Sequence, residues 1–271
     1  MKNYFLLCTI FLFFTDCNDN KKNVQISLTQ AQELYEQAQY SSAKQILDEL
    51  KVQYPKELEA QKKALLLMRK IEWKEQERNL AFCDSMIAVR QAEADSMKHF
   101  FIFEKTEYDD DGKYIEKSWN PPAETQLNYI KTLVTESGEI ALISVYNGFS
   151  DLQYDRLKVS TASGEYMETQ VIPFDGGANY SFQDGNGRRY QIVTYQKGRD
   201  NGVIGFIYNH SSEKLTVAYL GKKKYSYIIT SPMKKALVNS VNLAVALSDV
   251  RRLQKEKEKA EKRIEYLQSK I

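Results

Sequence analysis

The chain has 271 residues, of which 42% are hydrophobic and 27% are charged, proportions that are ordinary for a protein with a folded core. Its 38 Lys and Arg side chains nearly balance its 36 Asp and Glu side chains, which gives a formal net charge of +2. So small a charge excludes a strong whole-protein attraction to nucleic acid or to acidic membranes, and we expect no nucleic-acid partner.

Histidine and cysteine are scarce, which limits the chemistry available to the chain. It has two His and three Cys, and Cys8, Cys17 and Cys83 form neither a CxxC pair nor a Cys/His cluster. Neither a zinc site nor a disulfide framework is therefore indicated. The sequence also lacks a GxSxG motif, and its carboxylates are too scattered to nominate a glycosidase pair. We therefore predict no catalytic site, no metal site and no cofactor.

Residues 1–17 have the pattern of an export signal. Lys2 supplies a positive charge, and an apolar run from Tyr4 to Phe14 follows, too short for a bilayer span of roughly 20 residues. The run leads to Cys17 and then to a polar segment. This pattern resembles a bacterial lipoprotein signal, which implies a lipid on Cys17 and a membrane-anchored location in the cell envelope, periplasmic or surface-exposed. Asp16 stands where such signals carry a small residue, so ordinary secretion stays open as the alternative.

The next region is predicted to be a tether followed by helices. Residues 18–26 are short and polar, as in a flexible tether, and Ser27 and Gln30 have the spacing of a helix capping box. Helical spacing of apolar residues follows, and the helical region spans residues 27–98. The stretch resembles a single tetratricopeptide repeat, in which small residues let two helices approach closely. The matching residues are Ala31, Tyr40, Ala43 and Pro55, and Ala38 replaces the turn glycine.

A long helix is predicted from Glu57 to Met97, because this stretch contains neither Pro nor Gly. Its first half is strongly apolar and its second half carries a thinner apolar stripe. Cys83 lies beside that stripe with no histidine near it in sequence, so we interpret it as a packed small residue rather than a nucleophile.

Residues 99–231 change to the pattern of short strands. A hairpin begins at Phe101 and turns through Asp111-Gly112, and further strands are separated by Gly-containing turns such as Ser137-Gly138 and Ser163-Gly164. The candidate strands are Leu127–Thr135, Glu139–Tyr146, Tyr154–Thr161, Glu165–Ile172, Tyr180–Phe182, Arg188–Tyr195, Val203–Tyr208, Leu215–Leu220 and Lys224–Thr230. With no helix expected among them, this spacing predicts an antiparallel β-sandwich or barrel.

Residues 232–271 are predicted to form a closing helix. Ser231 is the expected N-cap and Pro232 the first helical residue. From Leu243 onward, apolar residues narrow to the seam of a coiled coil, interrupted by Lys257. The seam consists of Leu243, Ala246, Val250, Leu253, Lys257, Ala260, Ile264, Leu267 and Ile271. Because such a helix is marginal alone, we expect it to pack on the long N-terminal helix.

Together these features predict an α+β protein, with an N-terminal helical hairpin and long helix, a central antiparallel β domain and a C-terminal helix. The combination resembles uncharacterised bacterial envelope lipoproteins, which implies a location but no activity. We expect a non-catalytic lipoprotein that presents a β-sandwich head on a helical stalk as a binding or scaffolding module. Its partners would be the membrane, through the lipid anchor, and another envelope protein or a glycan.

Two alternatives remain, a surface glycan-binding module and an enzyme with an unrecognised site; the sequence does not assign a ligand-binding residue. Sandwich domains commonly bind sugars, and aromatic side chains in the strands could form a stacking face, although core packing explains them better. The aromatic residues in question are Trp119, Tyr146, Tyr195, Tyr208, Tyr219, Tyr225 and Tyr227.

Overall fold

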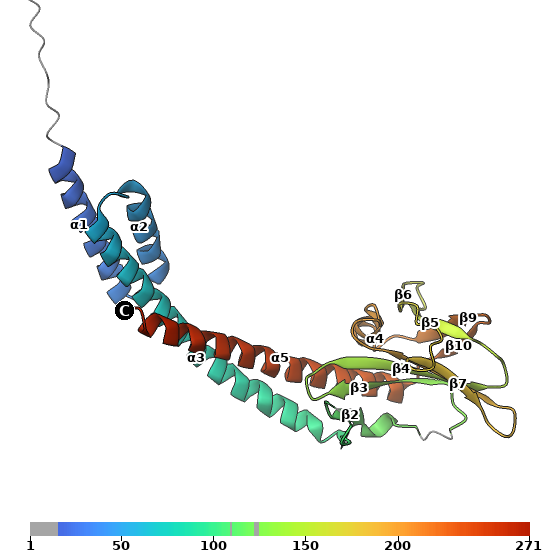
Figure 1. The fold of residues 1–271 in the computed structure, drawn as a ribbon. Coiled ribbons are helices and arrows are strands. Elements are labelled where there is room, and N and C mark those ends of the chain that lie inside the picture. The colour runs from blue at the N-terminus through green and yellow to red at the C-terminus, as the bar shows by residue number, and fades with distance from the viewer. Residues whose placement is uncertain (1–15, 109, 122–124) are drawn as a thin grey trace, which may run out of the picture. The chain divides into compact units, whose positions relative to one another are not determined.

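The computed structural model describes residues 16–108, 110–121 and 125–271, with side chains from residue 20 onward (Figure 1). Its α-helices are α1 (Asp16–Glu36), α2 (Tyr40–Gln53), α3 (Leu58–Lys98), α4 (Val203–Asn209) and α5 (Ser231–Gln268), with a 3-10 turn at Lys117–Trp119. Its strands are β1 (Phe101–Glu104), β2 (Lys113–Glu116), β3 (Tyr129–Thr135), β4 (Ile140–Gly148), β5 (Tyr154–Thr161), β6 (Tyr166–Glu168), β7 (Asn179–Gln183), β8 (Arg189–Tyr195), β9 (Leu215–Gly221) and β10 (Tyr225–Ile228). The predicted α+β class is confirmed.

The chain divides into two compact units, Met1–Asp84 with Glu256–Ile271, and Ser85–Lys255. In the first unit, α1 and α2 form a hairpin that shares a core with the first part of α3 (Figure 1). Ala31 and Ala43 are completely buried, as expected where two helices approach closely. The chain turns between α1 and α2 through Ala38, which has a φ of +56°, a conformation that glycine adopts more readily.

The predicted tether over residues 18–26 is wrong, because α1 already begins at Asp16 and includes this stretch. Ser27 therefore lies inside a helix and caps nothing. The reason is tertiary: Val24, Leu28 and Ala31 recur on one helical face and are buried in the core of the first unit. Residues 18–26 contribute only Val24 to this face, since Ile26 is exposed, and one residue does not define a helical period.

The predicted pairing of the two long helices is confirmed. In the first unit, Ala260 and Leu267 of the α5 seam are buried, whereas Ile271 is exposed. Charged side chains join α5 to α3: Arg263 forms a bidentate pair with Glu72 at 2.6 and 2.7 Å. Lys257, the polar residue in the seam, lies 2.6 Å from Asp84.

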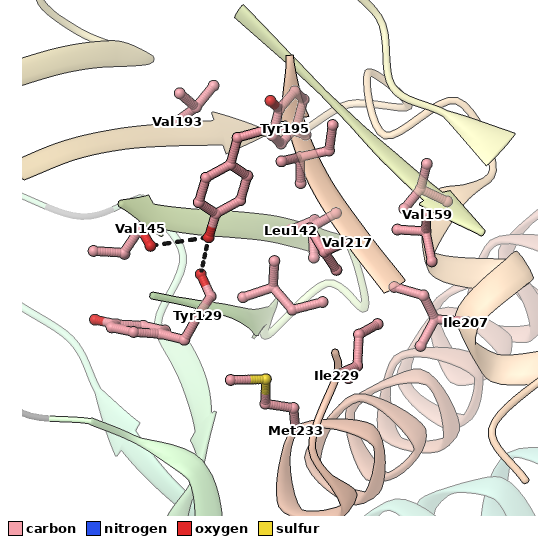
Figure 2. Close-up of a cluster of buried hydrophobic side chains, with 14 of the residues drawn as sticks. Tyr129, Leu142, Val145, Val159, Val193, Tyr195, Ile207, Val217, Ile229 and Met233 are labelled. Carbon is pink, nitrogen blue, oxygen red and sulfur yellow. Dashed lines mark hydrogen bonds between the residues drawn. The ribbon is translucent and has the colours of Figure 1, made fainter. Parts of the chain in front are cut away.

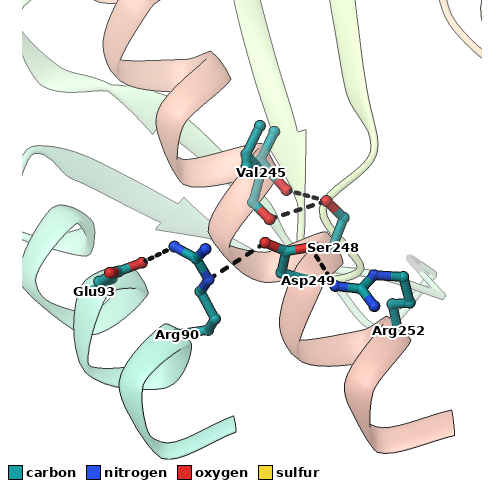
Figure 3. Close-up of polar contacts among 7 residues, drawn as sticks. Arg90, Glu93, Val245, Ser248, Asp249 and Arg252 are labelled. Carbon is teal, nitrogen blue, oxygen red and sulfur yellow. Dashed lines mark hydrogen bonds and ion pairs between the residues drawn. The ribbon is translucent and has the colours of Figure 1, made fainter. Parts of the chain in front are cut away.

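The second unit contains the β domain, the end of α3 and most of α5. The remaining seam residues of α5, Leu243, Ala246, Val250 and Leu253, are buried here. Figure 3 shows a charged contact between the helices, in which the Nε atom of Arg90 in α3 lies 3.4 Å from Asp249 in α5. Arg90 also pairs with Glu93 at 2.7 Å, and Arg252 pairs with Asp249 at 3.0 Å.

The β domain consists of two antiparallel sheets. The larger sheet has the strand order β1-β2-β3-β4-β8-β7 and the smaller one β10-β9-β5-β6. The predicted β1–β2 hairpin is present, with Phe101 opposite Glu116. The turns predicted at Ser137-Gly138 and Ser163-Gly164 connect β3 to β4 and β5 to β6, and both glycines have a positive φ.

One hydrophobic core lies between the sheets and includes residues of α4 and α5 (Figure 2). Side chains from both sheets and from α4 and α5 meet in it, among them Leu142, Val159, Tyr195, Ile207, Val217 and Met233. The Tyr219 hydroxyl lies 3.0 Å from the carbonyl oxygen of Tyr129 and 2.9 Å from that of Val145, so it links the smaller sheet to the larger. This bond satisfies a polar group that would be costly to bury alone.

Two local predictions in this unit are wrong. Val203–Tyr208 was expected to be a strand from its β-branched and aromatic residues, but it is helix α4 and interrupts the strands. Its buried residues Val203, Ile204 and Ile207 fall on one helical face, so tertiary burial overrides strand propensity. The cap of α5 is Thr230 rather than Ser231, because the Thr230 hydroxyl accepts the amide of Met233 at 3.4 Å.

Candidate functional site

The predicted lipid-attachment residue, Cys17, lies in α1, but its side chain is outside the described part of the chain, as are residues 1–15 of the predicted signal. None of the helices in the described ranges is long and apolar enough to cross a membrane. The described residues also contain no group of three or more His, Cys, Asp or Glu placed to hold a metal ion. Cys83 is buried, 1% exposed, in agreement with its interpretation as a packing residue.

Most of the aromatic residues considered for a sugar-stacking face pack in or against the core, Trp119 among them, whereas Tyr208 is 36% exposed and donates to Asn242. Tyr195 and Tyr219 are completely buried and Tyr146 is 5% exposed, so all three belong to the core. Tyr225 and Tyr227 are half-buried against the same core. Core packing, the favoured interpretation, accounts for these side chains.

The β domain has a cleft of about 390 Å³ where the ends of its two sheets separate. We call it the β5–β7 cleft. Its lining residues come from the start of β5, the segment between β6 and β7, and the facing sides of β7 and β8. They are Asp151, Gln153, Tyr154, Asp155, Val171, Pro173, Phe174, Asn179, Ser181, Arg189 and Gln191.

The floor of the β5–β7 cleft is a buried network of amides. The Gln191 side chain bonds both backbone groups of Tyr154, accepting its N–H at 3.2 Å and donating to its carbonyl at 2.7 Å. It also donates to the Asn179 side chain at 2.9 Å. Asn179 in turn donates to the carbonyls of Tyr154 and Ile172 at 3.1 and 2.8 Å. Both amide N–H₂ groups are therefore fully used in holding the two sheets together.

The acidic side of the cleft is created by a β-bulge. The β5–β9 register shifts between Tyr154 and Arg156, which leaves Asp155 as the extra residue. Such a bulge re-aims a side chain, and here it places the Asp155 carboxylate in the cleft. Its Oδ1 atom is buried and accepts no hydrogen bond within the described structure; the nearest cation is Arg156 at 3.8 Å.

A second carboxylate stands at the rim of the cleft. Asp151 accepts the side-chain amide of Gln153 at 2.8 Å and lies 3.6 Å from the Arg189 guanidinium. Arg189 is thus the one cation that lines the cleft, against the two carboxylates Asp151 and Asp155. The cleft has an excess of hydrogen-bond acceptors and of negative charge.

The opposite wall of the cleft is apolar and open to solvent. Val171 is 52% and Phe174 is 64% exposed, with Pro173 between them. The wall is held by the turn that follows it, where the Asp175 carboxylate accepts the amides of Gly177 and Asn179 at 2.8 and 3.0 Å. These backbone hydrogen bonds, the one from Asn179 above all, lower the pKa of Asp175 below its ordinary value. The Asp175 carboxylate thus closes the turn that follows Phe174.

The β5–β7 cleft leaves only part of its lining free to contact a ligand. Its lining residues include neither His nor Cys, and its amides are committed to structural bonds. What remains available to a ligand is an apolar wall, two carboxylates and one guanidinium. A few polar groups beside an apolar surface are typical of a ligand pocket.

A second hollow, about 460 Å³, lies between α2 and α3 in the first unit. Its apolar residues include Leu58 and Leu65, which are 69% and 51% exposed. Its rim carries Asp48, Lys51 and Lys62, charges of both signs. This surface therefore favours no particular ligand chemistry.

Sequence analysis missed the β5–β7 cleft. The bulge at Asp155 and the pairing of Asn179 with Gln191 depend on how the two sheets meet. The available signal in the sequence was the presence of amide side chains, Asn179 and Gln191, in or beside predicted strands. Such side chains are buried only when they have hydrogen-bond partners. No family model matches the chain, and neither a curated protein nor a solved structure does.

Proposed function

We propose that the chain is a non-catalytic binding protein of the bacterial cell envelope, attached to a membrane through a lipid on Cys17, and that the β5–β7 cleft holds its ligand. The anchoring part is supported by the basic, apolar and cysteine pattern of residues 1–17. The binding part is supported by one observation: the floor of the cleft is held by internal hydrogen bonds, while its apolar wall is exposed and two carboxylates line it. Polar groups used in this way fix a shape and leave a recognition surface.

Anchoring predicts that growing cells incorporate an alkyne analogue of palmitate into the wild-type chain and not into Cys17→Ala. A lipoprotein carries its acyl groups on this cysteine, through a thioether at Sγ and an amide at the α-amino group that cleavage exposes, so Cys17→Ala has no thiol to modify. Gel fluorescence after click labelling measures the incorporation, and Cys83→Ala is the matched control that should label normally, since Cys83 is buried. An unlabelled wild type, or label that survives in Cys17→Ala, would contradict the anchor.

Binding in the cleft predicts that a photoreactive residue at position 174 captures a partner in intact cells. With p-benzoylphenylalanine in place of Phe174, ultraviolet light should give a covalent adduct, because this exposed side chain stands in the cleft wall. The matched control replaces Tyr108, which is 89% exposed near β1 at the opposite edge of the larger sheet. Mass spectrometry of the purified chain measures the adducts. Adducts at both positions, or at neither, would contradict the cleft as the ligand site.

A further inference from the structure

Strand β7 forms an open edge of the larger sheet, next to the β5–β7 cleft. Its pairing with β8 uses alternate residues, as in any antiparallel ladder. Ala178 accepts the amide of Thr194 at 2.8 Å, and the amide of Asp184 donates to Arg188 at 2.9 Å, at the two ends of the strand. The even-numbered residues therefore bond to β8, and the backbone groups of Asn179, Ser181 and Gln183 point away from the sheet.

The first of these outward positions is already covered by the chain itself. The carbonyl of Asn179 accepts the amides of Asp175 and Gly176 at 3.2 and 3.1 Å, and its amide donates to the Asp175 side chain. This cover stops before Ser181 and Gln183. For these two residues, the described structure shows no partner on the outward backbone groups.

This edge also lacks the usual protection against strand pairing. Sheet edges are normally blunted by Lys, Pro, bulges or inward charges. Strand β7 reads Asn-Tyr-Ser-Phe-Gln, without charge or proline, and its register with β8 is continuous. By contrast, β1 at the other edge ends at Glu104 and is followed by Lys105. The β7 edge is therefore competent to accept a further strand.

The residues that line the cleft indicate which side chain such a strand would carry. A residue paired opposite Ser181 places its side chain on the same face as Ser181, and that face lines the cleft. There the apolar wall of Val171 and Phe174 suits an alkyl stem, and the carboxylates suit a cationic end. Residues on either side of it would fall on the opposite face, beside Phe182, which is 51% exposed and stacked on Tyr190 at 4.9 Å.

We propose that β7 accepts an extended peptide segment of a partner protein as an added antiparallel strand, with a Lys or Arg side chain in the β5–β7 cleft and apolar residues flanking it. The peptide backbone bonds Ser181 and Gln183, and its basic end pairs with Asp155, whose Oδ1 atom is buried and unbonded. This proposal rests on the proposed function, since it names the ligand class of the same cleft.

The test measures binding of a capped, fluorescent peptide, Thr-Val-Lys-Val-Thr, to the full chain by anisotropy. Replacing its Lys by Glu should weaken binding by roughly tenfold or more, since a charge-assisted bond in the cleft is lost. N-methylation of the Lys amide, which faces β7, should have a similar effect. N-methylation of a neighbouring Val amide, which faces away from β7, should leave binding unchanged and is the matched control.

On the protein, Ser181→Pro removes the outward amide, and Asp155→Asn removes the charge; each should weaken binding of the wild-type peptide by roughly tenfold. Asp110→Asn, an exposed acid of the β1–β2 loop, is the control that should bind normally. Circular dichroism checks that each variant folds. If Ser181→Pro does not, the N-methylated peptides test the same bond on the unaltered protein.

Equal binding of the Lys and Glu peptides, or of the two N-methylated peptides, would overturn the proposal. So would pairing of β7 with a second copy of the chain, seen as dimers that Ser181→Pro dissociates while the peptide fails to bind. The cross-linking experiment at position 174 shows whether only strand addition fails or the proposed function fails as well. A cross-linked glycan or lipid there, with no peptide binding, removes strand addition and retains the cleft, whereas no cross-link and no peptide binding removes both.

Discussion

The second unit should unfold cooperatively above about pH 11, because its core contains tyrosines that cannot ionise in place. Burial raises the pKa of Tyr154 and Tyr219 well above the ordinary value near 10, and it raises that of Tyr195 as well. All three side chains are completely buried. In the unfolded chain they lose their protons near pH 10, so above that pH the unfolded state binds fewer protons than the folded state and stability falls.

The size of this effect is large compared with the stability of a domain. Each such tyrosine lowers the free energy of unfolding by about 1.4 kcal/mol per pH unit above pH 10, so the three together lower it by about 4 kcal/mol per unit. Below pH 10 both states are protonated and these groups contribute no pH dependence. A domain is stable by roughly 5–15 kcal/mol, so a rise of two units, which removes about 8 kcal/mol, unfolds a domain in the lower half of this range. Circular dichroism and tyrosinate absorbance, followed together against pH, should change in one step.

Tyr195→Phe is the control for this alkaline unfolding. The Tyr195 hydroxyl has no hydrogen-bond partner in the described structure, so removing it sacrifices little at neutral pH. The variant should release about one proton fewer on unfolding above pH 10, which lowers the slope of unfolding free energy against pH by about a third. Tyrosine ionisation that is complete while the circular dichroism stays native would contradict the buried positions of these hydroxyls.

Periodicity and turn chemistry predicted most of this fold because they act locally. The strand pairs around Gly138 and Gly164 needed only a turn residue that tolerates a positive φ between two apolar runs. The start of α5 was predicted to within one residue from Ser231-Pro232, and the seam from Leu243 onward identified a helix that needs a partner. The long helix α3 followed from the absence of breakers over residues 57–97.

Features set by distant parts of the chain could not be predicted in this way. The run Val203–Tyr208 has strand composition, yet it is a helix whose buried face, Val203, Ile204 and Ile207, packs beside β5 and β6. The cleft depends on a bulge at Asp155 that is defined only by the register of β5 against β9. Its floor depends on Gln191 reaching Tyr154 across the domain, 37 residues away in sequence. Sequence patterns describe faces of elements; they do not specify which faces meet.

Replacing Gly138 by Ala should destabilise the second unit by about 2–5 kcal/mol, more than its place in a surface turn suggests. Gly138 has a φ of +82°, which costs an alanine about 1–2 kcal/mol. An added Cβ would also lie 2.4 Å from the backbone nitrogen of Ser248 and 2.8 Å from the carbonyl oxygen of Ala244, both in α5. Helix backbone cannot move aside as a flexible side chain can, so overpacking adds about 1–3 kcal/mol.

Gly164→Ala is the matched control, since Gly164 also follows a serine in a hairpin turn and has a φ of +98° but meets no atom within 4 Å of an added Cβ. It should cost only the conformational term, about 1–2 kcal/mol. In calorimetry, the Tm should therefore be about 10 °C lower for Gly138→Ala and less than about 5 °C lower for Gly164→Ala. Equal losses of stability in the two variants would mean that the β3–β4 turn does not contact α5. Contact with the helix backbone is the difference expected between the two positions. A larger loss at Gly138 follows directly from contact between this turn and the helix backbone at Ser248.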